Sequence, residues 1–174
     1  MALATFFGGI FGHAFCYAFG IAFKLPGWIL SMIAVMFSER ASIYFASKSI
    51  RNFYSRFFLY ANIVEFLTIL SVTIITVNFF FVEFHAFYGL LIVSGMFQLF
   101  HFYKTKNNPS LIILASIAVA ALAAFFQLSK ISISIWFQYM DIAHCLMALS
   151  AYILFLAVSK INAESEAFQK EQYN

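Results

Sequence analysis

Ionisable side chains interrupt long apolar stretches of this sequence, at positions that a membrane helix would place inside the bilayer. On insertion scales an Asp, Lys or Arg at the centre of a membrane helix costs about 2.5–3.5 kcal/mol, so such residues usually face the protein interior and often mark function. The set comprises His13, Glu39, Arg40, Glu65, Glu83, His85, Asp141 and His144.

Three histidines and one aspartate of this set are the first candidates for chemistry. Neutral imidazoles and carboxylates are ligands of Zn²⁺, and a catalytic zinc keeps three protein ligands and a water whose pKa falls to about 7. His13, His85 and His144 would supply three nitrogens. Asp141 lies three residues before His144 and shares its helix face, as a general base or as a residue that orients a histidine. Such a zinc site would suit hydrolysis of an amide or ester in a lipid that enters from the bilayer.

A second intramembrane polar cluster is formed by Glu39, Arg40 and Glu65. At a rise of about 1.5 Å per residue, Glu39 and Glu65 fall near the same depth as His13. Two interpretations stay open. Arg40 pairs with Glu39 or Glu65 and ties two helices together, or the three residues form the floor of a cavity that runs outward past the histidines.

The elements that position these residues are predicted to be membrane helices. The chain has 174 residues, of which 64% are hydrophobic and only 10% are charged, whereas soluble domains carry about 25% charged residues. A span needs roughly 20 apolar residues. Six segments qualify, and they predict an all-α, polytopic transmembrane helix bundle over residues 1–159: 2–23, 28–47, 57–77, 80–103, 111–128 and 136–158. Residues 160–174 form a polar tail.

The distribution of basic residues predicts that both termini are cytoplasmic. With that orientation the outer loops hold only Lys24 and Lys130, and Trp28 and Trp136 fall at the outer interface. The inner loops and tail hold Lys48, Arg51, Arg56, Lys104, Lys106, Lys160 and Lys170. Since the basic residues lie in loops between apolar runs, they give no reason to expect nucleic acid as a partner. The sequence has no phosphate-binding or dinucleotide motif.

Two short stretches resemble a group of small bacterial multi-helix membrane proteins. They are GGIFGHAF at residues 8–15 and YMDIAH at residues 139–144. That group distantly resembles the superfamily of alkaline ceramidases and adiponectin receptors, which are membrane hydrolases with zinc held by one early histidine and two in the last helix. The resemblance implies a helical fold in a bacterial inner membrane, with His13 and His144 as zinc ligands. Tyr139 stands where the pattern has the first histidine of the last helix, so His85 would complete the site.

Other functions fit the same residues. A Phe-rich protein with short loops suits a structural subunit of a larger membrane complex, whose polar groups join helices. His13 and His144 would be the pair for axial ligation of haem. Glu39, Glu65 and His13 would be the relay of a proton-coupled protein. The expected partners are the lipid bilayer and either a lipid substrate or the subunits of a complex.

Overall fold

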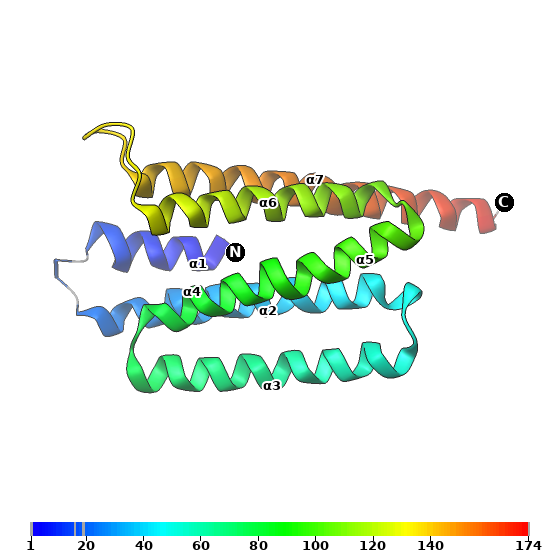
Figure 1. The fold of residues 1–174 in the computed structure, drawn as a ribbon, viewed down its shortest axis with the longest axis horizontal. Coiled ribbons are helices and arrows are strands. Elements are labelled where there is room, and N and C mark those ends of the chain that lie inside the picture. Colours follow the sequence, from blue (N-terminus) through cyan, green and yellow to red (C-terminus); the bar gives the residue numbers. More distant parts are fainter. Residues whose placement is uncertain (1, 16, 19, 174) are drawn as a thin grey trace. The chain divides into compact units, whose positions relative to one another are not determined.

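The computed structural model describes residues 2–15, 17–18 and 20–173, and every regular element in this part of the chain is helical (Figure 1). The prediction of an all-α protein with apolar helices long enough to cross a membrane is confirmed. The chain divides into two compact units, Met1–Phe97 and Gln98–Asn174. A single bundle over residues 1–159 stays a prediction.

Helix α2 (Leu25–Ala46) is the element around which the first unit packs. The 3-10 turn η2 (Ile21–Lys24) leads into it, and Pro26 occupies its first turn, where a missing backbone N–H costs no hydrogen bond. The π-helical segment η1 (Gly8–Ala14) continues α1, and the short turn η3 (Ser47–Ser49) follows α2. Helix α2 packs against α1 (Ala2–Phe7), α3 (Asn52–Thr76), α4 (Phe79–Phe87) and the π-helical segment η4 (Tyr88–Ser94).

The long apolar block between residues 57 and 103 is divided at Asn78, as the sequence predicts. Val77 has a left-handed backbone with φ of 46°, and its N–H donates to Thr73 O at 2.8 Å, which ends α3. Asn78 then caps α4, because its side-chain Oδ1 accepts from the N–H of Phe80 at 3.0 Å. The chain therefore reverses within two residues, and α3 and α4 pack side by side.

Helix α4 continues through η4 into α5 (Gly95–Thr105), so that one long helical rod contains a π-helical segment in its middle. A π-helical turn holds an extra residue, is rare, and is frequently found at functional sites. Because a π-helical turn contains an extra residue, the side chains that follow it are rotated about the helix axis. The distortion therefore changes which side chains of the rod face α2.

The second unit contains an antiparallel pair of helices, α6 (Asn108–Ser129) and α7 (Tyr139–Tyr173) (Figure 1). Ser116 and Ser150 join them reciprocally. Ser116 Oγ donates to Ser150 O at 2.8 Å, and Ser150 Oγ donates to Ser116 O at 2.9 Å. Both serines are buried, and small residues of this kind allow helices to approach closely in a membrane.

Five helices of the described residues have the length and composition of a membrane span. They are Ile21–Ala46, Asn52–Thr76, Phe79–Thr105, Asn108–Ser129 and Tyr139–Ala163, and each overlaps one of the last five predicted segments. The first predicted segment, residues 2–23, is helical over Ala2–Phe7 and Gly8–Ala14 and is not among these spans.

The polar tail continues α7 as a helix to Tyr173. Its sequence is rich in Ala, Glu, Gln and Lys, which are among the best helix formers. The apolar run that ends at residue 158 therefore marks the end of the hydrophobic span and not the end of the helix.

Side-chain polarity in both units suits a lipid environment. Large apolar side chains such as Phe37, Tyr60 and Phe80 are exposed, while Glu39 and His85 are buried. In water this distribution would leave a large apolar surface uncovered, but lipid chains cover it at no cost. The buried polar residues of the first unit are the ones that build its candidate site.

Candidate metal centre

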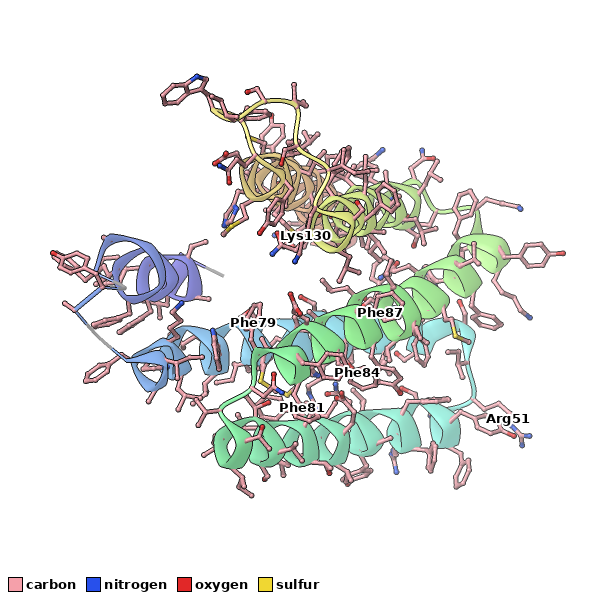
Figure 2. The ribbon with its side chains drawn as sticks, turned by 60° about the vertical axis from the view of Figure 1, so that its left-hand side comes forward. Arg51, Phe79, Phe81, Phe84, Phe87 and Lys130 are labelled. Atoms are coloured by element: carbon pink, nitrogen blue, oxygen red, sulfur yellow. The ribbon has the colours of Figure 1, made fainter. Side chains whose placement is uncertain are left out.

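Three helices of the first unit bring Glu39, Glu65 and His85 together. Glu39 comes from α2, Glu65 from the middle of α3 and His85 from α4, and one ligand atom from each lies within 4.8 Å of the other two. Figure 2 shows α4, marked by Phe81 and Phe84, alongside α2 and α3.

Both ring nitrogens of His85 have partners. Nε2 lies 3.1 Å from the backbone carbonyl of Met32, and Nδ1 lies 2.9 Å from Glu65 Oε1. A carbonyl oxygen only accepts hydrogen bonds, so Nε2 carries a proton and donates to the Met32 carbonyl. Nδ1 therefore faces the Glu65 carboxyl group. One proton then lies between Nδ1 and Oε1, whether Glu65 or the ring is its donor. The pair is neutral as a whole, which suits a His85 ring that is fully buried.

The Glu39 carboxyl group is only half satisfied. Asn62 Nδ2 donates to Glu39 Oε2 at 2.8 Å, and Glu39 is 1% exposed. Glu39 Oε1, Glu65 Oε2 and Asn62 Oδ1 are buried without a hydrogen-bond partner among the described residues. Unsatisfied buried acceptors are rare in folded proteins and cost about 1–3 kcal/mol each. Two of these atoms are carboxylate oxygens of residues in the same cluster, and a cation would stabilise them.

Gly89 provides the space that the Glu39 carboxyl group occupies. It lies at the start of η4 and is buried. A Cβ at this position would overlap Glu39 Oε1 and would lie 2.6 Å from Val35 Cγ1. Any larger residue would therefore require the Glu39 and Val35 side chains to shift, and the π-helical segment holds this glycine against the site.

The donor set is one imidazole nitrogen and carboxylate oxygens from two glutamates. Zn²⁺ accepts this mixture at three protein positions, and Mn²⁺ also accepts nitrogen together with oxygen. In metal sites a ligating histidine usually donates its other N–H to a carbonyl or a carboxylate, which fixes the ring. The contact of His85 Nε2 with Met32 O is of this kind, and it turns Nδ1 toward the two carboxyl groups.

A family model described as a family of unknown function, DUF6962, matches residues 1–163. The chain belongs to DUF6962. The match includes every residue of the cluster and both units. No curated protein and no solved structure matches the chain.

In this DUF6962 chain the sequence-predicted candidates are distributed over both units. His85 lies with Glu39 and Glu65, which joins residues that the sequence placed in two separate clusters. Arg40 does not form the predicted ion pair: its Nη1 donates to the backbone carbonyl of Leu59 at 3.0 Å, which still ties α2 to α3. The side chain of His13 lies outside the described residues.

Asp141 and His144 lie in the second unit and have local partners on α7. Asp141 Oδ2 accepts from the backbone N–H of Gln138 at 2.8 Å, which caps the first turn of the helix. His144 Nδ1 donates to the Met140 carbonyl at 2.5 Å, one turn earlier. A shared zinc site of His13, His85 and His144 stays a prediction.

Three parts of the site are absent from the sequence prediction. The first is the hydrogen bond from Asn62 to Glu39 across the helix pair, which the residue types do not reveal. Gly89 was missed, since one glycine in an apolar helix carries no signal until its neighbour is known. The Met32 carbonyl is a backbone atom, so its contact with His85 is invisible in the residue types.

Proposed function

We propose that this integral membrane protein binds a divalent metal ion within its first unit, with Glu39, Glu65 and His85 as ligands. The observation that carries the proposal is the convergence of three potential ligand atoms within 4.8 Å. The second oxygen of each carboxyl group supports it, because a buried oxygen without a hydrogen-bond partner is stabilised by a cation. Zinc is the first candidate and manganese the second.

We further propose a metal-dependent hydrolase, acting on an amide or ester bond of a lipid, as the activity. A zinc ion with three protein ligands keeps a fourth position for water, which is the arrangement of catalytic sites. The central position of Glu65 in α3 supports a substrate that enters from the bilayer rather than from water. The motif resemblance around His13 and His144 supports the same reaction class and a location in a bacterial inner membrane. In that alternative, the two histidines would be metal ligands in place of Glu39 and Glu65.

The test is the metal content of the full chain, purified in detergent, dialysed free of metal and then loaded with Zn²⁺ or Mn²⁺. Wild type is compared with Glu39→Gln, which keeps an acceptor for Asn62 but removes the carboxylate, and with His85→Gln. The expected result is about one ion per chain in wild type and a large loss in both variants. A metal at 100 times its Kd should also stabilise the wild type by about 2.7 kcal/mol.

The other outcomes are equally informative. Metal that is lost in His13→Ala and His144→Ala, but retained in Glu39→Gln, would assign the ion to the motif histidines. A folded wild type that takes up no metal would overturn both metal sites. It would favour a structural subunit of a membrane complex, in which the polar groups only join helices.

A further inference from the structure

The loop between α6 and α7, residues 130–138, turns its apolar side chains outward. Ile133, Ile135 and Trp136 are 74%, 80% and 89% exposed. Loops that face water are typically polar with a few turn residues. This loop instead alternates isoleucine with serine and then presents an indole, so its most exposed atoms are apolar.

Serine side chains of the same loop accept hydrogen bonds from its backbone N–H groups. Ser134 Oγ accepts from the N–H groups of Trp136 and Phe137 at 3.2 and 3.0 Å. Ser132 Oγ accepts from the N–H of Tyr139 at 3.0 Å. The Phe137 carbonyl accepts from the N–H groups of Ile133 and Ser134. These backbone groups therefore have partners without water, which is the condition for a non-helical segment to enter a low-dielectric region.

Both ends of the loop are held by helix caps. Lys130, labelled in Figure 2, has a left-handed backbone with φ of 54°, and its N–H donates to Phe126 O at 3.0 Å. At the other end Asp141 caps the N–H of Gln138. The loop is thus a folded projection with defined ends, and it connects two helices that each have the length and composition of a membrane span.

We propose that loop 130–138 is a membrane-interface anchor, which inserts Ile133, Ile135 and Trp136 into the headgroup and upper acyl-chain region of the bilayer. A loop between two spanning helices lies at a bilayer surface, so lipid is the nearest apolar phase for its side chains. Tryptophan prefers this interface, where its ring is apolar and its N–H remains solvated. Lys130, at the first position of the loop, adds a positive charge that lipid phosphate groups attract. The inference is independent of the metal centre.

Tryptophan fluorescence tests the anchor directly, because the chain has only Trp28 and Trp136. The Trp28→Phe variant of the full chain, reconstituted in phosphatidylcholine vesicles, reports on Trp136 alone. We expect a short-wavelength emission maximum, strong quenching by lipids brominated on their acyl chains, and weak quenching by acrylamide. The Trp136→Phe variant is the control, because Trp28 packs in the protein against Phe79, with ring centroids 5.2 Å apart.

Two results would overturn the anchor. Strong acrylamide quenching with no effect of brominated lipid would place the loop in water. Protection of Trp136 from both quenchers would mean that the loop docks on protein, including a second copy or a partner. A further variant, Ile133→Asn with Ile135→Asn in the Trp28→Phe background, should raise acrylamide quenching severalfold. No change in that variant would also contradict the proposal.

Discussion

The carboxyl group of Glu39 lies so close to Gly89 that a Cβ at position 89 would overlap its Oε1 atom. The two residues come from α2 and η4, and their contact sets how closely the rod that carries His85 approaches α2. Gly89 is therefore a positioning residue for the proposed metal centre, since it determines where the Glu39 oxygens lie relative to His85 Nδ1.

Replacing Gly89 by alanine should displace the Glu39 carboxyl group and weaken metal binding by at least tenfold. Overpacking of this kind costs about 1–3 kcal/mol, so the free energy of unfolding in detergent should also fall. The control is Gly95→Ala, because a Cβ there would meet only Leu90 O at 3.7 Å, which is ordinary contact. Equal behaviour of the two variants would contradict the positioning role.

The same contact predicts a rescue. Glu39→Asp shortens the side chain by one methylene and withdraws the carboxyl group from position 89. The double variant Gly89→Ala with Glu39→Asp should therefore unfold at a higher temperature than Gly89→Ala alone. A strictly additive loss in thermal unfolding would show that the two side chains do not compete for this space.

Asn62→Leu should destabilise the first unit by about 1–3 kcal/mol, because Glu39 Oε2 would lose its buried donor. The loss should be much smaller in the Glu39→Gln background. The glutamine amide does not ionise, and its NH2 group is a donor that can reorient. A double-mutant cycle on unfolding free energies in detergent measures this difference. Equal losses in both backgrounds would mean that the carboxyl group of Glu39 gains no more from Asn62 than an amide does.

Asp141→Ala and His144→Ala should leave the metal content unchanged if the ion is bound by Glu39, Glu65 and His85. Asp141→Ala should instead cost about 1 kcal/mol of stability, because the Gln138 N–H loses its cap. Asp141→Asn keeps an acceptor and is the matched control. A selective loss of metal without a loss of stability in either alanine variant would favour a site on α7.

Removal of the hydroxyl at Ser116 or Ser150 should weaken the α6–α7 pair by about 0.5–1.5 kcal/mol. The double variant should lose less than the sum, because the two hydroxyl oxygens also lie 3.1 Å apart and either single variant already removes this shared contact. Thermal unfolding in detergent measures the effect. Ser129→Ala is the control, since the Ser129 hydroxyl donates to Phe125 O within its own helix. A comparable loss of stability in this variant would contradict a special role for the buried Ser116–Ser150 pair.

The helical spans could be predicted from sequence because bilayer insertion depends on local composition. The break at Asn78 was also readable, since one polar residue divides an apolar block that is too long for a single span, and Asn caps helices well. The continuation of α7 to Tyr173 was not predicted, because polarity marks where a span leaves lipid while helix propensity decides where the helix ends.

The sequence by itself determined that this is a helical membrane protein with costly polar residues inside its spans, and that Glu39, Glu65 and His85 are among them. Only the tertiary structure decided that these three converge, that Arg40 bonds a backbone carbonyl, and that Gly89 makes room for the carboxyl group. The physical reason is that periodicity along one helix gives the face of a residue but not the rotation and register of the neighbouring helix. Contacts such as His85 with the carbonyl of Met32, 53 residues earlier, depend on that register.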